Sequence, residues 1–227
     1  MGMHARTKIL LGESGIDKLS QKKVIIFGVG GVGGYVAEML ARTGVGSITL
    51  VDFDVVSLSN LNRQIIALNS TIGVEKVLIM KNRIKDINPE IKADAVVKKL
   101  TPENIEDFNL SLFDYVVDCI DMVKSKIALI KHCFDNNINI VCSMGTANRN
   151  HIPYFDIYDL FSTKNDGLAR VLRRELKKIG VDKLNVVCSS NLPISSQELG
   201  SLVYFPASCA CCLSAFVIDE LLKTSKN

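Results

Sequence analysis

Apolar and polar positions alternate in two different rhythms along the first two thirds of the chain. Residues 23–27 (Lys-Val-Ile-Ile-Phe) form an apolar, β-branched run that stops at a glycine cluster, which is typical of a buried strand. Residues 35–42 repeat apolar side chains at helical spacing, Gly44 ends that helix, and 47–51 is a second apolar run. A strand, a glycine turn, a helix and a strand within about 30 residues predict a right-handed crossover in a parallel sheet.

The alternation continues to residue 145 and then changes. Up to that point the pattern predicts helices at 74–87 and 124–134, a helix start at 101–103, and strands at 92–98, 113–119 and 138–143. The remainder predicts strands at 153–158, 184–188 and 201–205, helices at 167–179 and 209–223, and a polar loop at 189–200. We expect an α/β fold with a Rossmann-like, open, mostly parallel sheet, flanking helices and an elaborated C-terminal third. All of 1–227 should form a single domain, with 1–145 as its nucleotide-binding core.

The composition is that of a packed chain. Of 227 residues, 48% are hydrophobic, 22% are charged and five are proline, which excludes a disordered or fibrous protein. We expect no signal peptide, and no apolar run approaches the length of about 20 residues that spans a bilayer. Seven cysteines, an odd number without disulfide-framework spacing, predict free thiols in a reducing compartment, and therefore a cytoplasmic location.

The first candidate site is the glycine cluster at 28–34, Gly-Val-Gly-Gly-Val-Gly-Gly. Glycines after a strand let backbone amides approach a phosphate, and the following helix offers its positive end to the anion. Asp52 ends the second predicted strand, where a carboxylate accepts hydrogen bonds from ribose hydroxyl groups. These features are common to nucleotide-binding enzymes, and they fit an NAD-dependent dehydrogenase as well as any other.

The polar residues that come next distinguish hydride transfer by a dehydrogenase from the breaking of a triphosphate. Segment 52–64 ends in Asn-Arg-Gln, and Lys76 and Asp121 follow farther along the chain. An enzyme that breaks a triphosphate uses arginine and lysine to neutralise charge on the leaving pyrophosphate, and a carboxylate to hold magnesium. Loops after parallel strands meet at one edge of the sheet, so these residues can share a cleft. The pattern therefore favours triphosphate chemistry.

In this region the chain resembles the ThiF/MoeB/HesA-type adenylating enzymes, which are related to ubiquitin-activating enzymes. The shared motifs are 28–34, 52–64, the lysine of Val-Glu-Lys-Val and Asp-Cys-Ile-Asp at 118–121, in the family's order and spacing. The resemblance implies an ATP- and magnesium-dependent enzyme that forms an acyl-adenylate. It implies that ATP is bound by Gly28, Gly30, Gly31, Gly33, Asp52, Asp54, Asn60, Asn62, Arg63, Gln64 and Lys76.

The same resemblance implies catalytic roles for Arg63, Lys76, Asp121 and Arg6, with Asp121 as the magnesium ligand. Arg6 resembles the family's N-terminal arginine that reaches the phosphates of the other subunit, which implies a homodimer. Many relatives have Asp-Cys-Thr-Asp-Asn where this chain has Met122 after Asp121, so no role is carried over from that asparagine.

The C-terminal third resembles a narrower branch, the tRNA threonylcarbamoyladenosine dehydratases. Matching segments are 42–46, 62–65, 83–84, 87–90, 118–123, 156–157, 166–170 and 172–178. The resemblance implies that the substrate is tRNA carrying threonylcarbamoyladenosine, which the enzyme activates and cyclises, and that 146–227 selects this substrate. It also implies a monovalent cation (Na⁺ or K⁺), whose ligands the sequence does not identify, and allows for a sulfurtransferase partner.

The distribution of charge agrees with a nucleic-acid partner. The chain has 27 basic and 24 acidic residues, a net charge of only +3. Basic residues nevertheless concentrate between 170 and 183, where a helix beside the cleft can hold tRNA phosphates. A solvated helix face is the alternative explanation. The candidate tRNA-binding residues are Arg170, Arg173, Arg174, Lys177 and Lys178.

Two rival functions remain open. Adenylation of a ubiquitin-like sulfur carrier, for thiamine or molybdopterin synthesis, usually accompanies two paired Cys-x-x-Cys zinc half-sites. Here only Cys209-Ala210-Cys211-Cys212 has that spacing, and structural zinc takes four ligands. We expect these cysteines to be buried thiols. The second rival is an NAD-dependent oxidoreductase or a nucleotide-binding sensor.

Overall fold

The computed structural model describes residues 2–223 and contains one seven-stranded sheet in the order β3-β2-β1-β4-β5-β7-β6. Every neighbouring pair is parallel except β6 and β7, which are antiparallel. The predicted open, mostly parallel α/β sheet is confirmed. The strands are β1 Lys23–Phe27, β2 Ser47–Asp52, β3 Lys92–Val97, β4 Tyr115–Asp118, β5 Ile140–Ser143, β6 Phe155–Asp159 and β7 Asn185–Ser189.

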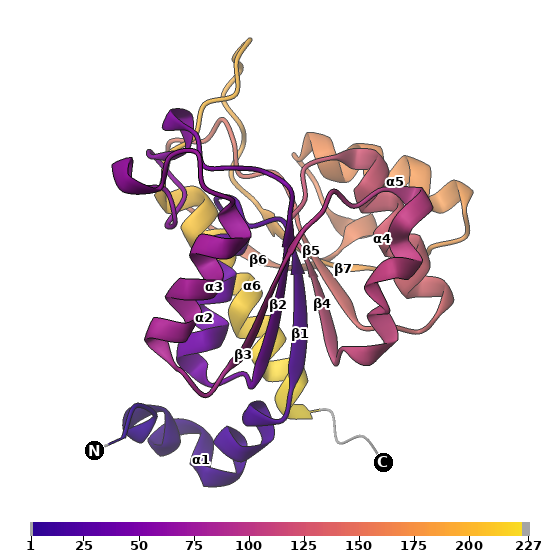
Figure 1. Cartoon of the computed structure of the whole chain (residues 1–227). Coiled ribbons are helices and arrows are strands. Elements are labelled where there is room, and N and C mark those ends of the chain that lie inside the picture. Colours follow the sequence, from indigo (N-terminus) through magenta and orange to yellow (C-terminus); the bar gives the residue numbers. More distant parts are fainter. Residues whose placement is uncertain (1, 224–227) are drawn as a thin grey trace.

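Helices cover both faces of the sheet (Figure 1). α2, α3 and α6 lie on one face and α4 and α5 on the other, while α1 lies beneath the sheet at the end opposite the long loops. The helices are α1 Ala5–Ser20, α2 Gly33–Thr43, α3 Lys76–Ile87, α4 Val123–Asp135, α5 Gly167–Lys178 and α6 Tyr204–Lys223. Short 3-10 helices occupy Leu58–Asn60, Asn69–Thr71, Pro102–Phe108, Leu110–Leu112 and Leu160–Ser162.

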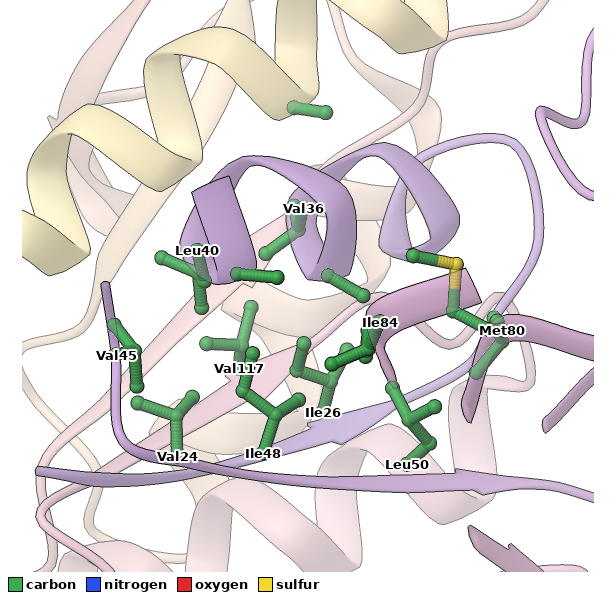
Figure 2. Packing of buried hydrophobic residues seen from close by; sticks show 14 of the residues in the cluster. Val24, Ile26, Val36, Leu40, Val45, Ile48, Leu50, Met80, Ile84 and Val117 are labelled. Atoms are coloured by element: carbon green, nitrogen blue, oxygen red, sulfur yellow. The ribbon is translucent and has the colours of Figure 1, made fainter. Parts of the chain in front are cut away.

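Alternate residues of β1 serve opposite faces of the sheet. Val24 and Ile26 belong to the core beneath α2, α3 and α6 (Figure 2), whereas Ile25 and Phe27 belong to the core on the other face. All four side chains are at most 1% exposed. A central parallel strand that is buried on both faces needs apolar residues throughout, which explains the continuous apolar run in the sequence.

The predicted strand at 201–205 is wrong. Residues 201–203 are irregular, and Tyr204 begins α6. The aromatic and β-branched residues there imitate a strand, but Pro206 has no backbone N–H for a sheet ladder and fits the first turn of a helix. The helix α1 was not predicted, because only Gly15, Ile16 and Leu19 are buried in it and Gly12 interrupts its helical backbone.

The helix α6 corrects a second expectation. It has 20 residues and a mean hydropathy of 1.6 in its most apolar window, so its length and composition would suffice to cross a membrane. The expectation that no apolar run approaches this length was therefore wrong. In the structure α6 packs on α2 and on strands β5, β6 and β7. Its core residues include Phe205, Cys209, Leu213, Val217 and Leu221, as expected of a core helix.

The contact between α2 and α3 contains a pH-sensitive ion cluster. Glu38 accepts hydrogen bonds from Arg42 Nε at 2.7 Å and from the Arg83 guanidinium. Burial disfavours the charged carboxylate, but the two guanidinium groups outweigh this and hold the pKa of Glu38 below its ordinary value. We expect Glu38→Gln to lower the free energy of unfolding by about 1–2 kcal/mol at pH 7. A depressed pKa stabilises the fold above the ordinary value of 4.5, so urea titrations should show this difference disappearing below it.

Candidate nucleotide-binding active site

A cleft of about 1200 Å³ opens at the carboxyl edge of the sheet. The residues that follow β1, β2, β4 and β5 all line it. Of the residues that the resemblance assigns to ATP, all line this cleft except Gly33. The sheet edge therefore brings together polar residues that are far apart in the sequence, as expected for an open α/β fold.

The glycines of the loop do two different things. Gly28 has φ +85°, and a Cβ there would lie 2.8 Å from the carbonyl oxygen of Cys119. A Cβ on Gly33 would lie 1.8 Å from the carbonyl oxygen of Gly28. These two glycines let the loop pack against itself and β4. Gly30 and Gly31, which line the cleft with Gly28, have room around them for backbone amides to approach a phosphate.

This difference gives a test of the loop. A Cβ on Gly30 would meet only the Gln64 amide nitrogen, at 3.7 Å. Gly30→Ala should therefore fold with an unchanged urea midpoint but bind ATP about tenfold more weakly, because the methyl group occupies space that a phosphate needs. Calorimetric titration with ATP measures the loss. Unchanged affinity would show that the nucleotide does not approach the loop here.

Asp52 is held in place by the loops on both sides of it. Its Oδ2 accepts a hydrogen bond from the N–H of Val29 at 2.7 Å, and its Oδ1 accepts one from the N–H of Asp54 at 2.9 Å. Both partners are backbone groups, so the carboxylate is fixed at the end of β2 beside the glycine loop. This fixed carboxylate is compatible with a ribose ligand, and the role of Asp52 in binding ribose stays a prediction.

The predicted phosphate-binding residues Lys76 and Arg63 each hold a neighbouring polar group in the cleft wall. Lys76 is buried with Nζ 2.8 Å from Oδ2 of Asp54. Arg63 donates through Nη1 to the carbonyl oxygen of Ser59 and to Oδ1 of Asn62, both at 2.9 Å. These contacts restrict two long cationic side chains beside the glycine loop. Both cationic side chains line the same cleft as Gly30 and Gly31.

Two amide side chains of this segment differ in their surroundings. Asn60 is 8% exposed, and its Oδ1 accepts the N–H of Ser57 at 3.1 Å, so it stabilises the turn that carries Arg63. Gln64 is 7% exposed, and its Oε1 has no hydrogen-bond partner among the described residues. A buried amide oxygen without a partner is costly, which makes Gln64 a candidate ligand contact.

Beneath Asp121 lies an ion pair that sequence reasoning missed. Lys126 Nζ is 2.9 Å from Oδ2 of Asp118, and both side chains are fully buried. Lys126 also donates to the carbonyl oxygen of Ile120 at 3.0 Å, and the N–H of Ile120 donates to Oδ1 of Asp118. Burial disfavours the ammonium, but the Asp118 carboxylate outweighs this and raises the pKa of Lys126. The pair thus fixes the turn that presents Asp121 to the cleft.

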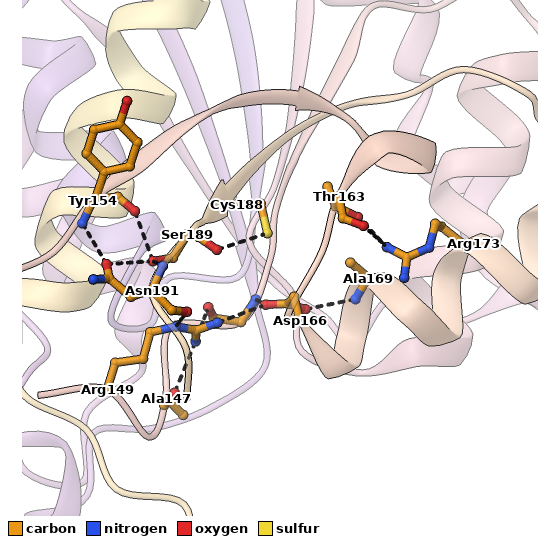
Figure 3. A network of polar contacts seen from close by, with 11 residues as sticks. Ala147, Arg149, Tyr154, Thr163, Asp166, Ala169, Arg173, Cys188, Ser189 and Asn191 are labelled. Atoms are coloured by element: carbon orange, nitrogen blue, oxygen red, sulfur yellow. Dashed lines mark hydrogen bonds and ion pairs between the residues drawn. The ribbon is translucent and has the colours of Figure 1, made fainter. Parts of the chain in front are cut away.

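Other predicted residues lie elsewhere. Arg6 is exposed on α1, which contacts α2 and α6 and lies at the end of the sheet opposite the long loops (Figure 1). It does not line the cleft. The N-terminal residues Gly167 and Leu168 of α5 line the cleft, but none of the five candidate tRNA-binding residues does. Arg173 donates through Nη1 to the carbonyl oxygen of Thr163 at 2.9 Å, so its guanidinium is held by the segment just before α5 (Figure 3).

The cysteines only partly match the expectation. Cys209 is buried, Cys212 is half-buried and Cys211 is exposed, so the prediction of buried thiols is wrong for Cys211. The cause is helical geometry, because consecutive residues 211 and 212 cannot both face the core that Cys209 faces. Burial raises the pKa of the Cys119 thiol to about 12, so this cysteine in the cleft wall stays protonated.

The second half of the cleft wall contains none of the predicted ATP-binding residues. It consists of the segments after β5 and after β7, together with the start of α5. Arg149 and Asp166, both buried, connect these segments, with Arg149 Nη2 3.5 Å from Asp166 Oδ2 (Figure 3). Arg149 lies in an irregular segment and carries no periodic signal, whereas Asp166 caps the N-terminus of α5 and belongs to the matching segment 166–170. Only the tertiary structure shows that the two residues pair.

The sheet, the glycine loop and the cationic residues Arg63 and Lys76 in the cleft define a nucleotide-binding enzyme of the adenylating class. The chain belongs to the ThiF family, whose model matches residues 4–189. It is 43% identical over 195 residues to the tRNA threonylcarbamoyladenosine dehydratase of Bacillus subtilis, covering 86% of this chain and 77% of the relative. The Escherichia coli enzyme of the same name is 38% identical over 187 residues, which cover 78% and 70%.

A solved structure gives the same result. The complex of the E. coli tRNA N6-threonylcarbamoyladenosine dehydratase, TcdA, with ATP superposes with a TM-score of 0.93 at 33% sequence identity. The match covers 97% of this chain and 93% of that chain. Similarity therefore extends through the C-terminal third of the chain.

Proposed function

We propose that this protein is an ATP-dependent tRNA threonylcarbamoyladenosine dehydratase. The observation that carries the proposal is the meeting of Arg63, Lys76 and Asp121 with the glycine loop in a single cleft. Similarity to dehydratases across 86% of the chain supports this substrate over a sulfur carrier. ATP is the expected nucleotide, since the superposed E. coli enzyme was solved with ATP. An NAD-dependent oxidoreductase is disfavoured by the same comparison.

In the proposed reaction, an oxygen of the threonylcarbamoyl carboxylate attacks the α-phosphorus of ATP, and the bond to pyrophosphate breaks. Arg63 and Lys76 stabilise the charge that develops on the phosphates. A nitrogen of the same group then attacks the activated carbonyl carbon, loses its proton and displaces AMP, which closes a five-membered ring. The second step is intramolecular, so positioning supplies much of its rate without a covalent cysteine.

Asp121 fits the proposed magnesium site. Its carboxylate lines the cleft, is exposed and makes no hydrogen bond or ion pair with the other residues of 2–223. A bare carboxylate beside a triphosphate would repel it, whereas Mg²⁺ commonly bridges one or two carboxylates and substrate phosphates. When bound, the ion would neutralise phosphate charge. Residues 2–223 offer no group of three or more His, Cys, Asp or Glu for a metal, and they suggest no ligands for the proposed monovalent cation.

A direct comparison of acceptors tests the substrate. We expect ATP–pyrophosphate exchange when the enzyme is incubated with tRNA that carries threonylcarbamoyladenosine. A small ubiquitin-like protein ending in Gly-Gly should not support exchange. The opposite preference would assign the protein to the sulfur-carrier branch instead.

On helix α5, the contacts of the candidate tRNA-binding residues favour only two of them. Arg174 and Lys178 both bind Glu175, at 2.7 and 2.8 Å. Arg170 and Lys177 are exposed and have no side-chain partner within the described part of the chain. These two are therefore the strongest candidates to bind phosphates.

We expect Arg170→Glu combined with Lys177→Glu to weaken tRNA binding at least tenfold and to lower its dependence on salt, while ATP affinity is unchanged. Filter binding at several salt concentrations measures both. Lys23→Glu combined with Lys92→Glu, on exposed residues at the amino edge of the sheet, is the charge-matched control. Equal losses in the two double variants would indicate only a net-charge effect.

Several further parts of the proposal rest on the resemblance. A homodimer would let Arg6 of one subunit reach the phosphates in the other, which is consistent with its position outside the lining of its own cleft. Residues 146–227 would select the substrate behind the core of 1–145. A tRNA substrate implies action in the cytoplasm, where a sulfurtransferase would be an additional partner. Sedimentation of the wild-type protein and of Arg6→Ala tests the first of these.

A further inference from the structure

One wall of the cleft is the irregular segment that connects β7 to α6, residues 190–203, which we call the wall segment. Pro193, Leu199, Gly200 and Ser201 of this segment line the cleft. Figure 1 shows the chain between β7 and α6 standing above the sheet, on the side of the long loops. The segment contains no helix or strand, so its position depends on contacts with neighbouring segments.

Asn148 holds the two arms of the wall segment together. Its N–H donates to the carbonyl oxygen of Gly200 at 2.8 Å, and its carbonyl oxygen accepts the N–H of Ile194 at 2.6 Å. Its side-chain Oδ1 accepts the N–H of Gly200, also at 2.6 Å. Asn148 has φ +56°, a left-handed conformation that asparagine tolerates better than most residues. One residue thus binds the outgoing arm at 194 and the returning arm at 200.

The neighbouring Arg149 fixes the base of the same segment (Figure 3). Its Nε donates to the carbonyl oxygen of Asn191 at 3.2 Å, and its Nη1 donates to that of Gly145 at 2.8 Å. Arg149 is 5% exposed and pairs with the buried Asp166. The base is therefore part of the packed structure.

The arms above this base are held more lightly. Besides the Asn148 contacts, the Nδ2 of Asn62 donates to the carbonyl oxygen of Ser201 at 3.1 Å. Asn62 belongs to the predicted ATP-binding residues, whereas Asn148 does not. Asn148 is therefore the position at which the hold on the arms can be changed without altering the nucleotide site.

The size of the cleft indicates what the wall segment adjoins. Sites for one small ligand usually have about 300–1,000 Å³, and this cleft has about 1200 Å³. A nucleotide on the glycine loop therefore leaves room for part of a second substrate. The lining that no ATP assignment uses includes 143–149, 165–168 and four residues of the wall segment.

We infer that Asn148 is a positioning residue for the second substrate: by holding the wall segment, it confines the acyl group of the tRNA against the nucleotide. This inference rests on the proposed function. It adds a role to a residue that touches neither ATP nor a metal in that proposal.

Confinement matters because the acyl-adenylate has two fates. Attack by the internal nitrogen forms a C–N bond, breaks the acyl C–O bond to AMP and releases the nitrogen's proton. Attack by water forms a C–O bond, breaks the same bond to AMP and returns the original carboxylate. Both release AMP, but only the first yields the cyclised nucleoside. A loose wall should therefore raise the ratio of AMP to cyclised product.

Two substitutions at one position separate the side-chain contact from the backbone. Asn148→Gly removes Oδ1 but tolerates the left-handed backbone, since glycine adopts it freely. Asn148→Asp keeps an oxygen that can accept the Gly200 N–H. Asn150→Gly changes a nearby exposed asparagine and is the control.

We expect Asn148→Gly to raise the KM for tRNA and the ratio of AMP to cyclised product about fivefold each, which corresponds to the loss of a hydrogen bond of about 1 kcal/mol. ATP affinity and the urea midpoint should be unchanged. Asn148→Asp should restore a ratio near the wild-type value, and Asn150→Gly should not alter it. A wild-type ratio and KM in Asn148→Gly would overturn the inference.

Hydrogen exchange tests independently of activity whether the Asn148 side chain holds the wall segment at Gly200. In Asn148→Gly the Gly200 amide should exchange about fivefold faster than in Asn148→Asp. If the wild-type protein cyclises no nucleoside, the proposed function fails, and this measurement then decides about the Asn148 contact alone. Equal Gly200 exchange in the two variants would contradict it.

Discussion

Replacing Asp121 with alanine should reduce ATP–pyrophosphate exchange about 1,000-fold or more while leaving the fold intact. Asp121 is exposed in the cleft, so its loss opens no cavity in the core. Its expected role is to hold a cation against the triphosphate, and groups that neutralise developing charge contribute factors of about 10²–10³ or more to rate. Arg63→Ala should cause a comparable loss, because the proposed role of Arg63 is to supply positive charge to the same phosphates.

The control for this experiment is Glu90→Ala, which removes an exposed carboxylate just before β3, at the other edge of the sheet. It should retain full exchange. Asp121→Asn keeps the shape of the side chain but removes its charge, and it should be as inactive as alanine. Circular dichroism melts verify that all four proteins are folded. Full exchange in Asp121→Ala would remove the basis for placing the reaction in this cleft.

Lys126→Met should lower the free energy of unfolding by about 3–5 kcal/mol, a large part of the stability of an ordinary domain. The substitution leaves the Asp118 carboxylate fully buried without its partner, 2.9 Å from where the ammonium lay. Breaking a buried pair by removing one partner is costly for this reason. The carbonyl oxygen of Ile120 also loses its donor, so the turn before Asp121 should loosen.

The matched control is Lys124→Met, which makes the same change at an exposed position of the same helix. Urea titrations should show little effect there. Combining Lys126→Met with Asp118→Leu removes both charges. The double variant should recover much of the lost stability, because it leaves no buried charge without a partner. Equal midpoints for the two single lysine variants would show that the buried pair does not stabilise the fold.

The sequence predicted the fold well where burial leaves a clear pattern of apolar residues. The central strands are buried on both faces, so their apolar runs marked five of the parallel strands within about two residues at each end. It failed where local and tertiary preferences compete. Residues 201–205 have strand-forming side chains, but Tyr204 and Phe205 belong to the first turn of α6. In α1 so few side chains are buried that helical spacing carries little signal.

The candidate site divides in the same way. The glycine loop and residues 52–64 are each contiguous in the chain, so the spacing of their residues is itself informative. Lys126, Asn148 and Arg149 act through contacts that only folding creates, with Asp118, Gly200 and Asp166 respectively. No periodicity distinguishes such residues from solvated ones. They are nevertheless the residues that hold Asp121 and the wall segment in place.

The central claim is that this chain dehydrates a modified adenosine in tRNA at the expense of ATP. The most direct measurement is mass spectrometry of the nucleosides of threonylcarbamoyladenosine-containing tRNA after incubation with the enzyme and ATP. We expect this nucleoside to lose the mass of one water, with release of AMP, and only when ATP is present. An unchanged nucleoside mass, with tRNA and ATP both bound, would contradict the claim.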